Sequence, residues 1–428
     1  MVKSMKQFTA LMLIAAVLLG AVSCQGKTSG HPGGDVSGQS ETSGEESTEK
    51  IPEEEKVTLN TFDLGIFMEK YWEGSTVYHE SIGFVEDNDG SIRSGELMYM
   101  PDSILSVRSS DLQQEYQEGA DYVVEGKRIV LTENSAIQPF PNETYSPHYA
   151  DSKTDWLKCS KDSTRYIAVD GSVRQHQIAV TYTHSDSWTG TIPQSEIDRL
   201  PKTKNKLENK EALNIVFYGD SITAGWEASG VDEYPLDVNT LQEFHFTSNT
   251  PPYCPAWASL VTQQLRKAYG YDDITYVNRG AGGSYSVWGK NNAAALVNPC
   301  KPDLVVIAFG MNQVGTSGKD IAADVLSIIQ TVAAENPDCE YVIVSCMEAN
   351  TECASFFGHQ LAAQEKAYYD LRDKETDYAI AIAPVHTMFA DLYANGKIYI
   401  DITGNNLNHP NDFSIRMYAQ TIAAVLGA

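Results

Sequence analysis

Short apolar runs separated by turn residues characterise the chain from about residue 57 to residue 200. Runs of this kind, typical of strands, occupy residues 122–124, 128–131, 166–169 and 177–182. Between the first two lies Gly126, which can adopt the positive φ that a tight hairpin requires. Because no helical periodicity intervenes, the pattern predicts an antiparallel β-sandwich or jelly-roll domain over residues 57–200.

After residue 213 the pattern changes to apolar runs that alternate with longer stretches of helical spacing. Strands are predicted at residues 214–218, 274–277, 304–309, 341–345 and 378–383, and helices at 256–269, 320–335, 356–374 and 414–426. Strands joined by crossover helices imply a mostly parallel sheet covered on both faces. We therefore predict a three-layer α/β/α domain over 213–428, preceded by a linker at 201–212 that is rich in Lys and Asn.

The first 24 residues carry an export signal. Lys3 and Lys6 precede an apolar run, 8–22, that is short for a membrane span and ends in small residues before Cys24. This arrangement resembles a bacterial lipoprotein lipobox, which implies that Cys24 carries lipid and becomes the mature N-terminus. An ordinary secretory signal or a buried core segment are the alternatives. We expect an exported lipoprotein held at the outer face of the cell membrane.

Residues 25–56 are dominated by Gly, Ser, Thr and Glu, with Val36 and Ile51 as the aliphatic residues. Eight acidic residues against three lysines favour an extended chain, and the segment has too little apolar area to offset the entropy of ordering. It is predicted to be a disordered acidic linker; a pro-segment is the alternative.

Charge and cysteine content exclude several classes of partner. The chain has 31 Lys and Arg against 57 Asp and Glu, a formal net charge of −26, which argues against nucleic acid as a partner and against membrane contact other than through a lipid anchor. Seven cysteines in 428 residues are too few for a disulfide scaffold, and no C-x-x-C pair indicates a zinc ribbon. A disulfide between Cys254 and Cys300 is compatible with an oxidising exterior, but the spacing of the two residues does not establish it.

Polar blocks follow three of the predicted strands and recur near the C-terminus. They are the Gly-Asp-Ser triplet at 219–221, Asn-Arg-Gly-Ala-Gly-Gly-Ser at 278–284, Phe-Gly-Met-Asn-Gln at 309–313, and Asn-Leu-Asn-His-Pro-Asn-Asp at 406–412. In order and position the blocks resemble those of the SGNH (GDSL-type) hydrolases, over 214–428, half the chain. With the upstream β-region, the chain is similar to bimodular bacterial carbohydrate esterases, which remove acyl groups from polysaccharide.

The resemblance implies roles for four residues. Ser221 would be the nucleophile and His409 the base that takes its proton, since a serine hydroxyl is a poor nucleophile without a neighbouring imidazole. The oxyanion would be bound by the backbone N–H groups of Ser221 and Gly283 and by the amide of Asn312. No metal or organic cofactor is implied. Asp220 is expected to brace the turn.

Each of these residues also has an ordinary structural interpretation. Ser221 could cap a helix, His409 could lie on the surface, Gly283 could form a tight turn and Asn312 could close a loop. Their occurrence together, in order, favours the catalytic interpretation.

One position departs from the family pattern. Family members commonly have Asp three residues before the histidine, where this chain has Asn406. A neutral amide can orient the ring but cannot stabilise an imidazolium by charge. We therefore predict a Ser–His dyad, with Asn406 as a possible orienting residue and Asp401 or Asp412 as substitutes from nearby loops.

The insertion 226–255 is rich in aromatic residues, of which Trp226 and Tyr253 are candidates to line a substrate site. The alternative is an insertion with a small core of its own. In the β-region, Trp156 and Trp188 are either a sugar-stacking platform or packing residues. Three histidines outside the blocks are expected to be packing or rim residues: His176, His184 and His245.

Together these features predict a surface-anchored serine esterase that hydrolyses acyl esters, O-acetyl esters above all, on a polysaccharide or oligosaccharide. A lipase or thioesterase of the same fold is the competing enzyme, and a non-catalytic glycan-binding lipoprotein is the competing class.

Overall fold

The computed structural model describes residues 63–148, 157–169, 171–356 and 358–428. The signal segment with Cys24, the acidic linker and Trp156 lie outside the described residues. Contacts group Leu59–Ala428 as one compact unit, so the two predicted domains share a packed interface. In the described part of the chain no helix is long and apolar enough to cross a membrane.

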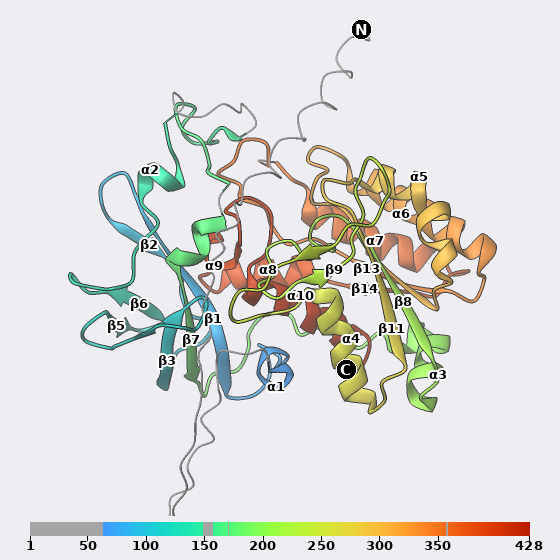
Figure 1. Ribbon diagram of the computed structural model, residues 1–428, viewed down its shortest axis with the longest axis horizontal. Helices are drawn as coiled ribbons and strands as arrows, with labels where there is room; N and C mark the ends of the chain where they lie inside the picture. Colours follow the sequence, from blue (N-terminus) through green and yellow to red (C-terminus); the bar gives the residue numbers. More distant parts are fainter. Residues whose placement is uncertain (1–62, 149–156, 170, 357) are drawn as a thin grey trace, which may run out of the picture. The chain divides into compact units, whose positions relative to one another are not determined.

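The β-rich region is antiparallel, as predicted. Its main sheet has the strand order β2-β1-β7-β3-β4, and a separate hairpin pairs β5 with β6 (Figure 1). The strands are β1 (Thr76–Glu86), β2 (Ile92–Ser94), β3 (Ser103–Ser109), β4 (Glu115–Tyr116), β5 (Tyr122–Glu125), β6 (Arg128–Leu131) and β7 (Gln177–Thr183). Gly126 turns the β5–β6 hairpin at a φ of +62°. The prediction of a strand at 166–169 was wrong. In this run the structure has an isolated bridge between Lys158 and Tyr166 instead of a strand.

Short helices accompany these strands. They are α1 (Leu64–Phe67), α2 (Asn142–Tyr145) and the 3₁₀ turns η3 (Gly171–His176) and η4 (Ile197–Arg199). Asp63 caps α1 by accepting from the backbone N–H of Gly65 at 2.7 Å.

The second region contains a parallel sheet with the strand order β11-β8-β12-β13-β14, which confirms the predicted α/β class. The strands are β8 (Leu213–Gly219), β11 (Ile274–Gly280), β12 (Leu304–Ala308), β13 (Glu340–Val344) and β14 (Ile380–Ala383). The strands β12, β13 and β14 are buried at every position, because helices cover both faces of the sheet. The ends of β8 and of its neighbours β11 and β12 bring the first three polar blocks to one edge.

Helices of two groups form the outer layers (Figure 1). One face is covered by α5 (Ser286–Leu296), α6 (Gly318–Glu335) and α7 (Leu361–Lys374), the other by α4 (Trp257–Tyr269), α8 (Val385–Ala394) and α10 (Asp412–Val425). A small hairpin, β9 (Asp232–Glu233) with β10 (Phe246–Thr247), lies in the insertion. The remaining elements are the short 3₁₀ helix η5 (Asn298–Cys300) and the short helix α9 (Tyr399–Ile402).

The segment predicted as a linker is helical instead. It begins with α3 (Pro201–Asn209), in which Thr203 and Leu207 are buried. The backbone N–H groups of Lys202 and Thr203 donate to the carboxylate of Glu340 at 2.9 and 2.7 Å. Because this cap comes from a distant strand, the local sequence gives no sign of it.

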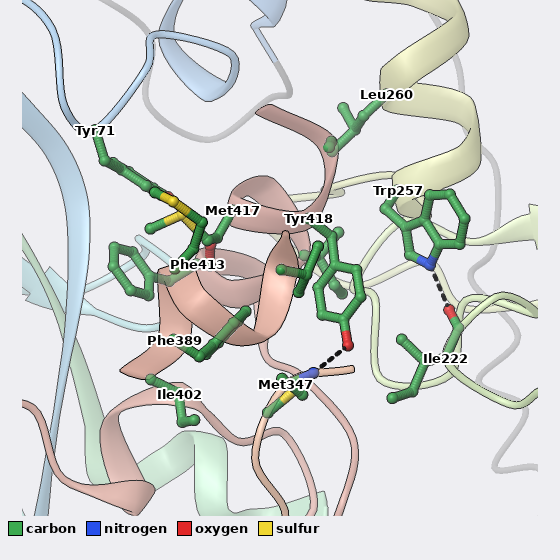
Figure 2. Packing of buried hydrophobic residues seen from close by; sticks show 14 of the residues in the cluster. Tyr71, Ile222, Trp257, Leu260, Met347, Phe389, Ile402, Phe413, Met417 and Tyr418 are labelled. Atoms are coloured by element: carbon green, nitrogen blue, oxygen red, sulfur yellow. Dashed lines mark hydrogen bonds between the residues drawn. The ribbon is translucent and has the colours of Figure 1, made fainter. Parts of the chain in front are cut away.

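Helix α10 is buried along its whole length and joins the two regions. Figure 2 shows Phe413 and Met417 beside Tyr71 of the β-rich region, while Tyr418 lies towards Trp257 of α4. The Tyr418 hydroxyl accepts from the Met347 backbone N–H at 2.8 Å. The histidine block just before α10 is therefore packed against both regions.

Candidate active site

Ser221 and His409 meet at the carboxyl edge of the parallel sheet. Ser221 lies in the turn after β8, and His409 lies in the loop before α10. The Ser221 Oγ is 2.9 Å from Nε2 of His409, and the two residues are 3% and 6% exposed. Asp220 braces the turn as predicted, since its Oδ1 accepts from the Ile222 N–H at 3.0 Å.

Burial controls the charge of His409. Desolvation lowers the pKa of its imidazole to about 4, because the ring would have to carry its charge away from water. The edge of Trp226 contributes to this environment, with ring centroids 5.3 Å apart at 71°. At neutral pH the ring is uncharged, which is the form that can accept a proton.

Asn405, not Asn406, orients the histidine. The Nδ2 of Asn405 lies 2.9 Å from Nδ1 of His409. Asn406 has a φ of +63° and donates to the carbonyl of Ala168 at 3.1 Å, while its own backbone oxygen accepts from Asn350. The prediction of Asn406 was wrong by one residue, because the left-handed turn directs that side chain towards the β-rich region.

The hydrogen bonds of Asn405 fix the orientation of its amide. Its Oδ1 accepts from the backbone N–H groups of Leu407, Asn408 and His409 at 3.0, 3.0 and 3.1 Å. Flipping the amide would place its NH₂ group against these three donors. Nδ2 is therefore the atom that faces Nδ1 of His409, so the ring accepts there and its proton lies on Nε2, towards Ser221.

Neither aspartate considered from the sequence takes the place of an acid. Asp401 accepts from the N–H groups of Gly83 and Ile398, both at 2.8 Å. Asp412 accepts from the Ser229 N–H at 3.0 Å and from Arg174 at 3.2 Å. In the described part of the chain, the side-chain partners of the His409 ring are the Asn405 amide and the Ser221 hydroxyl.

The three groups that were predicted to bind the oxyanion follow the ends of neighbouring strands. Gly283 follows β11 with a φ of +73°, a conformation that favours glycine. Among the described residues, the backbone N–H groups of Ser221 and Gly283 donate to no protein acceptor. Asn312 follows β12, and its Nδ2 donates to the Ser284 carbonyl at 3.0 Å, which leaves the second amide hydrogen available.

A comparison with sequence families identifies this part of the chain. A family model described as the GDSL-like lipase/acylhydrolase family matches residues 217–413, which include all four blocks. Residues 217–413 are thus similar to the GDSL-like acylhydrolases. A search of curated proteins gave no match.

Solved structures that match part of this chain include two esterases and a lipase/acylhydrolase. A two-domain esterase (CEX) active on acetylated mannans, co-crystallised with mannopentaose, is 24% identical over 55% of this chain and 54% of its own, with a TM-score of 0.40. A point mutant of Axe2, an acetyl-xylooligosaccharide esterase from Geobacillus stearothermophilus, is 17% identical over 50% of this chain and 94% of its own, with a TM-score of 0.37. A lipase/acylhydrolase from Enterococcus faecalis is 16% identical over 49% of this chain and 93% of its own, with a TM-score of 0.36.

These similarities cover only part of the chains compared, at low sequence identity. The chain matches only about half the length of the two-domain esterase. At these identities and TM-scores, we draw no conclusion from the structures about activity or substrate.

Aromatic residues of the insertion lie at different distances from the Ser221–His409 pair. Trp226 lies against Gly282, where an added Cβ would be 3.1 Å from the indole ring, and Phe246 lies 6.1 Å from that indole between centroids. Tyr253 has a φ of +63° and donates its N–H to Thr250, with no described contact to the Ser–His pair. The insertion also has buried residues of its own, as the alternative interpretation predicts, and substrate lining stays a prediction: Ala228, Val231, Leu236 and Cys254.

The other candidates from the sequence have structural contacts. Trp188 donates to the Thr191 carbonyl and packs edge-on against Tyr99. Cys254 and Cys300 are free thiols. The three histidines considered from the sequence stack on aromatic rings, as expected for packing or rim residues: His176 on Phe140, His184 on Tyr99 and His245 on Tyr234. In the described part of the chain, no group of three or more His, Cys, Asp or Glu could hold a metal ion.

Proposed function

We propose that the acylhydrolase domain is a serine esterase that hydrolyses acyl esters through Ser221 and His409. The observation that carries this is the 2.9 Å contact between the Ser221 Oγ and His409 Nε2, beside backbone N–H groups that have no protein acceptor among the described residues. Preset donors at the place where negative charge develops are the largest single contribution to catalysis in such sites.

The reaction follows from this geometry. The Ser221 oxygen bonds to the acyl carbon as its proton passes to His409, and the oxyanion accepts from Ser221, Gly283 and Asn312. The carbon–oxygen bond to the alcohol then breaks, and the alcohol leaves with that proton. Water attacks the acyl-enzyme, His409 takes the proton of the water, and the acid is released.

Asn405 makes this dyad a slow one. To accept a proton at Nε2, His409 must carry its own proton on Nδ1, where the Asn405 amide presents a donor rather than an acceptor. The base-competent tautomer is thus the less favoured one. We expect measurable but modest turnover.

For the substrate, we propose O-acetyl esters on a polysaccharide or oligosaccharide. The proposal rests on the sequence resemblance to bimodular carbohydrate esterases. The buried Ser–His pair suits a small acyl group, and Tyr234, Phe244 and Tyr285 are exposed aromatic residues of the kind that stack on pyranose rings. A lipase would instead need a wide apolar cleft for the acyl chain.

The test is acetate release from a panel of acetylated mannans, xylans and other glycans, with Ser221→Ala as the matched control. Labelling by a fluorophosphonate, read by mass spectrometry at Ser221, reports the nucleophile independently of substrate. Acetate release that Ser221→Ala abolishes supports the proposal. Absence of both release and labelling in the parent protein would refute it.

A non-catalytic glycan-binding protein is the second candidate, and one observation favours it. The donor at Nδ1 favours the tautomer of His409 that carries its proton on Nε2 and therefore cannot accept one from Ser221. If the parent protein bound glycans without releasing acetate or reacting with fluorophosphonate, this second function would replace the first.

We also propose that the chain is an exported lipoprotein anchored at Cys24, on the strength of the N-terminal sequence. The anchor and the acidic segment after it would hold the acylhydrolase domain outside the membrane.

A further inference from the structure

The catalytic histidine lies in a segment, residues 400–411, that begins in α9 and that we call the histidine loop. Its two arms contact each other beside the histidine: Thr403 forms a bridge with Pro410, and the N–H of Gly404 donates to the His409 carbonyl at 2.9 Å. The Thr403 hydroxyl donates to the same carbonyl at 3.2 Å. The position of Thr403 therefore determines the position of His409.

Gln177, the first residue of β7, holds this loop from the β-rich region. Its side chain is 3% exposed, and its Nε2 donates to the carbonyls of Ile400 and Thr403 at 2.6 and 2.7 Å. Its Oε1 accepts from Asn411 at 3.3 Å. One amide thus binds the loop on both sides of the histidine.

Strand β1 holds the same loop through its backbone and one hydroxyl. The N–H of Gly83 donates to Asp401 at 2.8 Å, and the hydroxyl of Ser81 accepts from Asn411 at 3.1 Å. A Cβ at Gly83 would lie 2.7 Å from the Ile400 side chain, so the strand and the loop are in close contact.

A buried ion pair stabilises the junction next to these bonds. Lys397 and Glu80 are both 0% exposed at their side chains, with Nζ and Oε1 2.5 Å apart. Lys397 also donates to the Ser81 carbonyl at 2.8 Å, and Glu80 accepts from the Tyr182 hydroxyl at 2.6 Å. A buried pair is retained at a defined geometry only when such further hydrogen bonds satisfy it.

We propose that the β-rich region is a positioning element of the active site, and that Gln177 is its principal positioning residue. Gln177 acts through Thr403 to hold His409 Nε2 within reach of Ser221. A reacting group displaced by about 1 Å loses about a hundredfold in rate, so hydrogen bonds to the arms of this loop affect turnover directly. The inference rests on the proposed esterase function for its kinetic readout.

The experiment compares Gln177→Ala and Gln177→Met with the full-length parent, on p-nitrophenyl acetate. Met keeps the side-chain volume and removes both donors. The matched control is Val107→Ala, which removes a buried side chain from strand β3 of the same sheet and has no described hydrogen bond to the histidine loop. All variants are assayed well below their melting temperatures.

We expect kcat to fall at least about tenfold in both Gln177 variants, with KM within about twofold of the parent and kcat unchanged in Val107→Ala. Retention of the parent kcat in Gln177→Ala, or an equal loss in Val107→Ala, would overturn the inference, since the second result would mean that the β-rich region contributes only stability.

A second measurement is independent of activity. Burial holds the His409 pKa at about 4, so a loosened loop that admits water should raise it towards the ordinary value of about 6.5. NMR titration of the His409 ring in Gln177→Ala should show this rise. An unchanged pKa refutes the positioning role even if the parent proves to have no esterase activity, whereas an inactive parent with a raised pKa in the variant refutes only the proposed function.

Discussion

Replacing Asn405 with Asp should convert the weak Ser–His pair into an efficient triad. The Oδ1 position of residue 405 already accepts three backbone N–H groups, which a carboxylate oxygen would continue to do. The second oxygen would take the place of Nδ2, 2.9 Å from Nδ1 of His409, and would accept a proton there. The lone pair of Nε2 would then face Ser221.

The magnitude follows from the environment of the ring. Desolvation by burial alone lowers the His409 pKa to about 4. A carboxylate in contact favours the imidazolium and raises a neighbouring pKa by about 1–3 units, each unit being about 1.4 kcal/mol. Since His409 must be neutral to act as a base, the acid limb of kcat/KM should move upward, from about pH 4 to between about pH 5 and pH 7.

Above that limb the rate should increase. Removing the acid's charge from a Ser-His-Asp triad lowers kcat by about 10⁴-fold, mainly by favouring the wrong tautomer. The reverse change here should raise kcat at pH 8 by at least about tenfold, with about 10⁴ as the ceiling. The gain is limited by Asn408, whose Oδ1 now accepts from Asn405 at 3.2 Å and would have to rotate away from a carboxylate.

The assay is kcat/KM for p-nitrophenyl acetate from about pH 4 to about pH 9, with thermal denaturation as a check on folding. Asn406→Asp is the control, because it adds the same charge one residue away on a side chain that contacts Ala168. It should leave the acid limb in place. An unshifted limb and an unchanged rate in folded Asn405→Asp, or an equal shift in Asn406→Asp, would refute the reasoning.

Further predictions concern the remaining site residues. Ser221→Ala and His409→Ala should each lower turnover by several orders of magnitude at an unchanged melting temperature, since the two act as a unit; near-parental activity in either excludes the pair. Asn312→Ala should lower kcat about 10²–10³-fold with little change in KM, whereas an effect on KM alone would remove it from the oxyanion site. Gly283→Ala should cost about 1–2 kcal/mol of stability, measured by denaturant unfolding, because its φ of +73° strains a Cβ. Cys24→Ala should leave the chain unprocessed or released from membranes, and a mature N-terminus without lipid mass would contradict the anchor.

Much of the catalytic region could be predicted from local sequence. The inner strands β8 and β12 are buried almost throughout and are largely apolar, whereas the edge strand β11 is only partly buried, and a polar block marks the point where each of these three strands ends. Since the carboxyl ends of adjacent parallel strands meet at one edge, the blocks that contain Ser221, Gly283 and Asn312 had to come together. That the histidine block joins them at Ser221 was implied by the resemblance of the four blocks to those of the SGNH hydrolases, and the structure places Ser221 and His409 in contact.

Tertiary structure decided the features that depend on distant partners. Asn405 and Asn406 are adjacent amides, and only the backbone turn, with φ at +63°, determines which one faces His409. The helix at 201–209 is capped by Glu340 from another strand, and the histidine loop is held by Gln177, more than 200 residues earlier in the chain. Hydrogen bonds of this kind leave no periodic or compositional trace, because their geometry exists only after the two regions have packed together.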